Sequence, residues 1–378
     1  MTIIIVGGGY SGLHLAKLIG DGALLFEEHK NIGIPEHCAG IISPKTFKII
    51  GCPRNLIEEY YNELRIYTGH GIISWIGNPL AIKINRIALE KYLYHEALSN
   101  GAKIILGSRV EEVNFNGKVK VKNTFYKGDI IVIAEGARRF FSRKLGLTSK
   151  CDVFHGLQVR LKAKCNVKEI EVYLTNLAEK FFAWLIPIPS NNQAIIGLAS
   201  KSTLNLNLKL NRLVNLLEKH GKIKVYQFIN YFGGLILTGP VGKISIGNII
   251  GIGDSIQMNK PLTGGGLYPI TISNKILAKN LNMTLNGEIN FNEAVKAYES
   301  EVKFLIKKLR NSYYLAKLIR NTDYELLKII AKGSMKINLH KKILGELDYD
   351  DHYTSLIKSI FKPNNLMNYF ASLLLGLI

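Results

Sequence analysis

Two kinds of hydrophobic pattern alternate in the first part of the chain. A run of β-branched residues at positions 2–5 leads through Val6 into a cluster of glycines, and positions 13–19 then have the apolar spacing of an amphipathic helix. A second short apolar run occupies positions 23–26. The order is therefore a buried strand, a tight turn, a helix and a second strand. This order indicates a βαβ unit with parallel strands.

The rest of the chain changes pattern twice. Positions 64–84 alternate like hairpin strands, 85–100 have helical spacing, 110–125 suggest a hairpin, and 129–137 contain a buried strand followed by a glycine turn. Most segments between 151 and 239 have strand character, with one predicted helix at 208–220. The first pattern returns with an apolar run at 248–254 and a helix that extends to 281, and the chain is helical beyond about 290.

These patterns predict an α/β fold in three parts. Residues 1–60, 84–150 and 240–290 are expected to form a discontinuous nucleotide-binding domain around a parallel sheet. Residues 61–83 and 151–239 are expected to form an inserted domain with an antiparallel β-sheet. Residues 291–378 are expected to form a C-terminal helical segment.

The glycine cluster has the spacing of a dinucleotide-binding turn. Gly7 permits the tight turn after the strand, Gly9 lets the backbone approach a pyrophosphate, and Gly12 lets the helix lie close to the strand. The N–H groups of the first helical turn would face the phosphates. The alternative is a tight structural turn that binds nothing, but the flanking strand and helix favour a nucleotide.

The second strand ends in Glu27, about 20 positions after Gly7. A carboxylate at this place is expected to accept hydrogen bonds from the ribose hydroxyls of an adenosine. The alternative is that Glu27 and Glu28 mark the solvated end of a strand.

Composition excludes several classes of protein. The four cysteines form no Cys-x-x-Cys pair, so we expect reduced thiols in a cytoplasmic protein and no structural metal site. The first strand leaves no room for a secretory signal, and the apolar run at 370–378 is far shorter than the ~20 residues of a membrane span.

The charge is strongly basic, with 49 Lys and Arg against 29 Asp and Glu, a net charge of +20. No recognition motif supports nucleic-acid binding, so we expect none. The charge suits an anionic membrane surface or an acidic electron carrier, and a bias toward lysine codons explains it equally well.

Five separated motifs together resemble the hydroxylase subgroup of glutathione-reductase-type flavoproteins. They are GGGYSG at 7–12, Glu27, Arg86 at a helix start, AEGA at 134–137, and GIGDS at 251–255 with PLTGGG at 261–266. Within that subgroup, PEHCAGIIS at 35–43 and FAWLIP at 182–187 are similar to the PxxCxGxIS and YxWxFP motifs of the geranylgeranyl reductase family. The resemblance covers about residues 1–290.

The resemblance implies FAD as cofactor in a Rossmann-type domain. Asp254 would hydrogen-bond the ribityl hydroxyls, and Gly264, Gly265 and Gly266 would open a helix whose N–H groups hold the pyrophosphate or the flavin edge. Arg86 would face the cofactor. The alternative for Asp254 is that it only caps the next turn, and the alternative for Arg86 is that it lies on the surface near a helix N-terminus.

The resemblance also implies reduction of C=C bonds in a polyprenyl lipid by hydride from flavin N5, with a proton added to the other carbon. Cys38 is the candidate for proton delivery or gating, because a thiol is mostly protonated at neutral pH. Phe182 and Trp184 would line the prenyl tunnel. Phe182 replaces the tyrosine of the family motif, which removes a candidate proton donor. The alternative for Cys38 is that it is a small buried residue that only fills space. The alternative for Phe182 and Trp184 is that their rings belong to the core of the sheet.

Two other functions stay open at this point. One is an FAD-dependent monooxygenase or epoxidase of the same fold acting on an aromatic, quinone or isoprenoid substrate. The other is a membrane-surface protein with a vestigial FAD fold, supported by residues 364–378 and the lysine-rich helices before them. For the reductase, the electron donor is NAD(P)H or a small iron–sulfur protein, and the protein is expected in the cytoplasm or peripherally on the inner membrane face.

Overall fold

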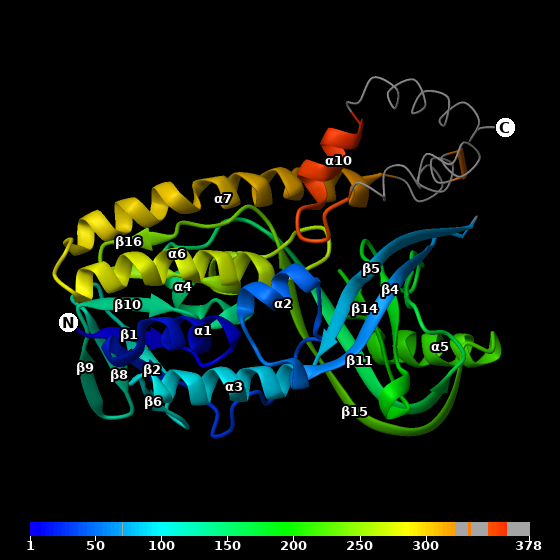
Figure 1. Ribbon diagram of the computed structural model, residues 1–378, viewed down its shortest axis with the longest axis horizontal. Coiled ribbons are helices and arrows are strands. Elements are labelled where there is room, and N and C mark those ends of the chain that lie inside the picture. Colours follow the sequence, from blue (N-terminus) through cyan, green and yellow to red (C-terminus); the bar gives the residue numbers. More distant parts are fainter. Residues whose placement is uncertain (70, 323–331, 334–346, 361–378) are drawn as a thin grey trace.

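The computed structural model describes residues 1–69, 71–322, 332–333 and 347–360. Two sheets lie end to end along the long axis of the molecule, and helices cover them (Figure 1). The first sheet has the strand order β16-β17-β10-β1-β2-β6, and all of its pairs are parallel except β16 with β17. Its strands are β1 (Ile3–Val6), β2 (Ala23–Phe26), β6 (Lys103–Ile105), β10 (Ile130–Ile133), β16 (Ser245–Ile246) and β17 (Ile249–Gly251).

Helices bury this sheet, which explains why its central strands are continuously apolar rather than alternating. Every residue of β1 and β10 is buried. Helix α1 (Tyr10–Ile19) contacts α3 (Arg86–Ser99) and α6 (Leu267–Leu285), and α6 packs against the long helix α7 (Phe291–Asn321).

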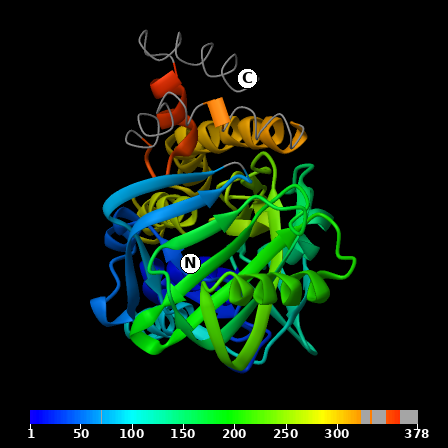
Figure 2. The same cartoon turned by 90° about the vertical axis from the view of Figure 1, so that its right-hand side faces the viewer.

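The second sheet is mostly antiparallel and has the order β15-β11-β14-β13-β12-β4-β5-β3. Helix α5 (Leu206–Lys219) packs on β11, β14 and β15, and Figure 2 shows this end of the molecule. The strands are β3 (Ile41–Ile42), β4 (Ile57–Tyr67), β5 (Ile72–Ile84), β11 (Asp152–Cys165), β12 (Ile170–Tyr173), β13 (Ala183–Ile188), β14 (Gln193–Ser200) and β15 (Ile223–Thr238).

Smaller elements complete the described chain. A three-stranded sheet is made of β7 (Val110–Val113), β8 (Lys118–Val121) and β9 (Thr124–Lys127). The remaining α-helices are α2 (Pro44–Ile50), α4 (Phe140–Lys144) and α10 (His352–Ile360). The 3-10 helices are η1 (Gly20–Gly22), η2 (Arg54–Leu56), η3 (Gly136–Arg138), η4 (Pro189–Asn191) and η5 (Gly253–Ile256).

The structure confirms the predicted α/β fold with an inserted antiparallel sheet and C-terminal helices. Three details differ. The predicted hairpin at 64–84 is longer, because β4 begins at Ile57, and the hairpin at 110–125 gains a third strand, β9. Phe182 precedes β13 instead of lying within it, although Ala199 N donates to its carbonyl at 3.2 Å and continues the ladder.

Within the described residues, no helix is both long and apolar enough to span a bilayer. The apolar run at 370–378 and the predicted membrane segment at 364–378 lie outside the described residues.

Candidate functional site

The glycine turn between β1 and α1 has little room for side chains except at its tip. Gly7 has a φ of +110°, and a Cβ on Gly12 would lie 2.0 Å from the Gly7 carbonyl oxygen, so both positions require glycine. Gly9 is the N-cap of α1, and a Cβ there would meet no atom within 4 Å. Space therefore lies next to free N–H groups at a helix N-terminus, which is the geometry of an anion site.

Glu27 closes this turn on one side. Its carboxylate accepts a hydrogen bond from Gly8 N to Oε2 at 2.6 Å, and from His29 N to Oε1 at 2.8 Å. Oε1 also lies 2.5 Å from His29 Nδ1, whereas Oε2 has one partner and therefore keeps acceptor capacity for a ribose hydroxyl.

Beyond the turn, buried polar atoms gather without hydrogen-bond partners among the described residues. They are Ser11 Oγ, Arg86 Nε and Nη1, Arg139 Nε and Asn259 Oδ1. Buried polar groups are almost always paired, so such a group of them calls for a polar ligand.

The distances tie these atoms to the second half of the predicted site. A Cβ on Gly253 would lie 2.8 Å from Ser11 Oγ, and a Cβ on Gly266 would lie 3.6 Å from Asp254 Oδ1. Asn259 Nδ2 donates to the same Asp254 oxygen at 3.3 Å. The glycine turn and the 253–266 segment therefore meet, and their donors and acceptors fit a dinucleotide such as FAD.

Arg86 supplies a permanent positive charge to this region. It is buried, donates to Glu90 Oε1 at 2.5 Å, and lies 5.2 Å from the Tyr10 ring centroid. Burial alone would lower the pKa of Arg86, but its neighbours, with the Glu90 carboxylate the largest influence, raise it. Asp254 responds in the opposite way, because burial raises the pKa of its carboxyl and Asn259, Arg86 and Arg139 only partly offset this.

The Cys38 loop is fixed to the large sheet. Glu36 Oε1 accepts from Arg160 Nη2 on β11 at 2.8 Å, and His37 Nδ1 lies 2.8 Å from the Gly233 carbonyl oxygen on β15. Gly40 N donates to Cys38 Sγ at 3.4 Å, and the thiol is half-buried. A Cβ on Gly40 would lie 2.9 Å from Arg86 Cγ, so this loop reaches the group of unpaired polar atoms.

An aromatic cluster on the large sheet lies next to the Cys38 loop, and Ala39 packs against it. Trp184 donates its Nε1–H to Gln158 Oε1 at 3.2 Å, and the Phe182 ring contacts it edge-on at 5.8 Å between centroids. A Cβ on Gly197 would lie 2.5 Å from the Trp184 indole, so this glycine makes room for the ring. The rings of Phe182 and Trp184, the two candidate tunnel residues, are therefore in contact with each other.

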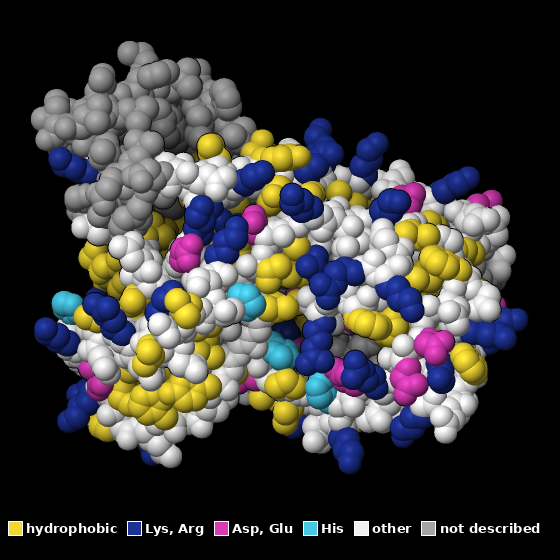
Figure 3. Space-filling model, turned by 180° about the vertical axis from the view of Figure 1, so that it is seen from behind, with side chains coloured by type: hydrophobic (Ala, Val, Ile, Leu, Met, Phe, Trp, Pro, Cys, Tyr) yellow, Lys and Arg dark blue, Asp and Glu magenta, His cyan; other side chains and the backbone are white. Residues whose placement is uncertain are grey.

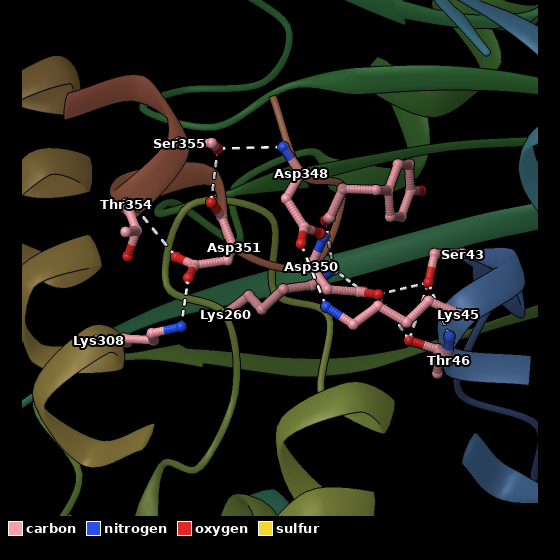
Figure 4. Close-up of polar contacts among 11 residues, drawn as sticks. Ser43, Lys45, Thr46, Lys260, Lys308, Asp348, Asp350, Asp351, Thr354 and Ser355 are labelled. Carbon is pink, nitrogen blue, oxygen red and sulfur yellow. Dashed lines mark hydrogen bonds and ion pairs between the residues drawn. The ribbon is translucent and has the colours of Figure 1, made fainter. Parts of the chain in front are cut away.

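Residues from the far end of the chain also reach this region (Figure 4). Asp350 is buried and accepts from Lys260 Nζ at 3.3 Å, from Thr46 Oγ1 at 3.0 Å and from Ser43 Oγ. Lys260 lies beside the glycine loop, because a Cβ on Gly265 would be 2.9 Å from its Cε. Burial lowers the pKa of Lys260, and Asp350 opposes this shift.

Tyr349, next to this carboxylate, joins the aromatic cluster. Its ring stacks on Trp75 at 5.4 Å and packs against the cluster that contains Trp184. Two weaker links, Lys45 to Asp348 at 3.2 Å and Lys308 to Asp351 at 2.7 Å, hold the same segment. We call residues 348–351 the acidic clamp, because it joins the glycine loop, the N-terminus of α2 and the aromatic cluster.

Sequence reasoning missed several of these residues. Arg139, Lys260, Tyr349 and Asp350 were not predicted, although Lys260 directly precedes the PLTGGG motif. The structure also gives Glu135 a local role, since its carboxylate accepts from Phe141 N at 3.0 Å and Ser142 N at 2.7 Å at the start of α4. Gly264 donates its N–H to the Lys260 carbonyl at 2.8 Å, so this group of the glycine loop stabilises the loop itself.

Comparison with known proteins agrees with this geometry. No protein-family model matches the chain. An uncharacterised protein of Methanocaldococcus jannaschii is 28% identical, with 92% of each chain covered. A digeranylgeranylglycerophospholipid reductase of Methanococcus vannielii is 26% identical, with 98% of each chain covered.

Solved structures share the fold. A geranylgeranyl bacteriochlorophyll reductase-like protein from Thermoplasma acidophilum superposes with a TM-score of 0.80 at 19% identity, and 98% of each chain is covered. The p-nitrophenol 4-monooxygenase of Pseudomonas putida superposes less well, with a TM-score of 0.70 at 12% identity and the same coverage.

Proposed function

The chain belongs to the geranylgeranyl reductase family of FAD-dependent oxidoreductases, and on this basis we propose that it saturates C=C bonds in the geranylgeranyl chains of membrane-lipid precursors. Several relatives that align over most of the chain are digeranylgeranylglycerophospholipid reductases. The observation that carries the proposal is the position of the Cys38 loop, which is hydrogen-bonded to the large sheet beside the aromatic cluster and packs against Arg86 through Gly40.

FAD, when bound, supplies the hydride from its reduced N5. The residues that would hold it are Gly7, Gly9 and Gly12 with the N-terminus of α1 at the pyrophosphate, and Glu27 at the adenosine ribose. Asp254 and the 264–266 glycines would bind the other half. The unpaired atoms of Ser11, Arg86 and Arg139 would then gain partners.

The protein's own contribution is orientation, exclusion of water and a proton. An isolated trisubstituted alkene offers no polar group to hold, so its chain must be oriented by apolar contact, which Trp184 and Phe182 would supply. One alkene carbon receives the hydride, and the Cys38 thiol gives its proton to the other carbon. The thiolate that remains would be stabilised by the Arg86 guanidinium before a proton from solvent restores the thiol.

For the electron donor we propose a small acidic iron–sulfur protein rather than NAD(P)H. The chain's net charge of +20 would steer an acidic carrier toward it. A reduction rate that falls steeply with added salt would support the carrier, and fast salt-independent reduction by NADPH would contradict it.

The proposal as a whole is tested by anaerobic mixing. The FAD-loaded protein is reduced with dithionite, freed of excess reductant, and mixed with digeranylgeranylglycerol phosphate in detergent. Reoxidation of the flavin, together with a product two mass units heavier per reduced bond, is expected. A fully saturated analogue serves as the control. A flavin that stays reduced with every prenyl lipid but is reoxidised rapidly by oxygen and a phenol would favour a monooxygenase and overturn the proposal.

A further inference from the structure

Arg320, in the last turn of α7, differs from most basic residues of the chain. In Figure 3, lysine and arginine side chains are spread over the visible face, as expected for a net charge of +20. Arg320 is instead half-buried, and burial lowers the pKa of its guanidinium to about 10, so it remains charged at neutral pH. Removing a charge from water is costly unless the group is hydrogen-bonded, so the partners of Arg320 are the evidence for its role.

The guanidinium donates to two separate parts of the protein. Nη1 donates to Thr238 Oγ1 at 3.0 Å, at the end of β15. Nη2 donates to the carbonyl oxygens of Pro261 at 2.6 Å and of Leu262 at 3.3 Å, directly before the three glycines at 264–266. Because a guanidinium presents its N–H groups in a planar fork, this one side chain holds the large sheet and the glycine loop at a fixed separation.

The same guanidinium covers two phenylalanine rings. Its Cζ lies 4.8 Å from the ring centroid of Phe154 and 5.1 Å from that of Phe181. A cation is attracted to an aromatic face, most strongly where water is excluded. Phe181 stacks on Phe182 at 4.4 Å, and the Phe182 ring contacts Trp184, so a continuous row of rings runs from Arg320 to the two candidate tunnel residues.

The glycine loop also packs directly on the aromatic cluster. A Cβ on Gly264 would lie 2.6 Å from Ile236 Cγ2, and Ile236 packs against the cluster. Such close packing requires the loop to keep one position relative to the rings. Arg320 is bonded to the loop just before this contact and covers rings of the cluster, so it is placed to hold the two together.

We propose that Arg320 is a positioning residue that fixes the glycine loop (residues 261–266) against the aromatic cluster, so that the cofactor-binding loop and the wall that orients the prenyl chain keep one relative position. The inference rests on the proposed function where it takes Phe182 and Trp184 to contact the lipid. The link between Arg320 and the loop does not depend on the substrate.

Three variants separate this role from a general effect of charge. Arg320→Met removes the charge and every donor but keeps a long side chain that covers the rings. Arg320→Lys keeps the charge, but a single ammonium cannot reproduce the fork between Thr238 and the two carbonyls. Arg310→Met is the matched control, because Arg310 is exposed on the same helix.

The first measurement is the rate at which the FAD-loaded, full-length protein releases FAD after dilution, followed by flavin fluorescence. Arg320→Met should release FAD about tenfold faster or more, because a loop that has lost hydrogen bonds from a charged donor holds the cofactor less firmly. Arg320→Lys should lie between Arg320→Met and the wild type. Arg310→Met should match the wild type.

The second measurement is anaerobic reoxidation of the reduced flavin over a range of digeranylgeranylglycerol phosphate concentrations, with excess FAD. The maximal rate of Arg320→Met should fall by about 10–100-fold, since a small misplacement of reacting groups is enough for such a loss. The lipid concentration at half-maximal rate should change less than twofold, because the rings themselves remain.

A purely structural role for Arg320 gives a different result. If Arg320 only anchors α7, Arg320→Met lowers the thermal midpoint but keeps the wild-type rates of FAD release and reoxidation, and the proposal is wrong. Equally fast FAD release by Arg310→Met would also overturn it. If Arg320→Met does not fold, Arg320→Lys carries the same comparison. Failure of the proposed function is distinguishable: the FAD release rates still differ as expected, but no prenyl lipid reoxidises the flavin of any variant or of the wild type.

Discussion

At the scale of single residues, the site combines groups that prefer opposite environments. Arg86 keeps its charge although it is buried, because Glu90, Cys38 and Tyr10 surround it with acceptors and acids. Asp254 is driven toward its neutral form by burial and is only partly supported by Asn259 and the two arginines. A polar ligand between them would relieve both, because Arg86 Nε and Nη1 have no acceptor among the described residues and burial works against the charge of Asp254.

Cys38→Ser tests the role of the thiol. We expect FAD binding to persist and the rate of flavin reoxidation by a prenyl lipid to fall by about 10²–10⁴, because a hydroxyl is a far weaker proton donor. Anaerobic stopped-flow absorbance measures this rate. Cys151→Ser is the control, since Cys151 is half-buried and lies in a loop beside Gly239, and its rate should equal that of the wild type. Full activity of Cys38→Ser would assign the proton to another group.

His14 predicts a pH dependence of stability. It lies buried in α1 with its ring stacked on Tyr10, and burial lowers the pKa of its imidazole from 6.5 to about 3. Between these values the unfolded chain binds a proton that the native chain does not, so the free energy of unfolding falls as the pH falls. The contribution approaches about 1.4 kcal/mol per pH unit.

Urea titrations between pH 7 and 4 check this expectation. His14→Phe should reduce the slope of the free energy of unfolding against pH, by an amount that corresponds to the uptake of at most one proton. His95→Phe, at an exposed position on α3, should leave this slope unchanged. Equal slopes in all three proteins would show that His14 takes up its proton in the native state.

At the scale of secondary-structure elements, prediction succeeded where the signal was local. The strand–glycine–helix order at 3–19, the helix near 85–100 and the strands of the inserted sheet each follow from spacing and turn residues. The N-cap of α3 shows why, since Asn85 Oδ1 accepts from Ala88 N at 2.9 Å three residues away.

The acidic clamp could not be predicted in this way. Asp350 meets Ser43 and Thr46 across about 300 residues of chain, and no periodicity or motif connects these positions. The same holds for Arg139, whose left-handed φ of +53° is set by the turn after β10 rather than by its own preference. Contacts of this kind are decided by tertiary packing, which a single sequence does not display.

Asp350→Asn tests how strongly the clamp is tied to the glycine loop. The change leaves the buried Lys260 ammonium without its carboxylate, so we expect a loss of about 3–5 kcal/mol in the free energy of unfolding. Lys260→Met/Asp350→Asn should recover much of this loss, because no unpaired charge remains and the amide oxygen still accepts from Ser43 and Thr46.

Asp351→Asn is the matched control for that experiment. Its partner Lys308 is 44% exposed, so solvent screens the pair and the loss should be about 1 kcal/mol or less. Urea unfolding at constant pH compares the four proteins. Similar losses for both single variants would mean that the Lys260–Asp350 pair is no more strongly coupled than a surface pair.

At the scale of the whole molecule, the candidate FAD site joins segments that are distant in the sequence. The glycine turn and Glu27 come from the start of the chain, Arg86 and Arg139 from the middle, and Asp254 with the glycine loop from the region before α6. The charges of these segments converge, and several of their buried polar atoms have no hydrogen-bond partner within the described part of the chain, which costs free energy of folding.

FAD should therefore stabilise the entire fold. A ligand that binds only the native state adds about 2.7 kcal/mol when its concentration is a hundred times its Kd. Thermal unfolding of the protein, stripped of FAD and then titrated with it, should show a midpoint that rises continuously with FAD. Glu27→Gln should shift this dependence to about 10–100-fold higher FAD, because the lost carboxylate makes charge-assisted hydrogen bonds. Glu28→Gln, next in sequence and more exposed, should leave the dependence unchanged. If the midpoint does not respond to FAD, the converging segments bind something else, and the family's cofactor is not what completes this fold.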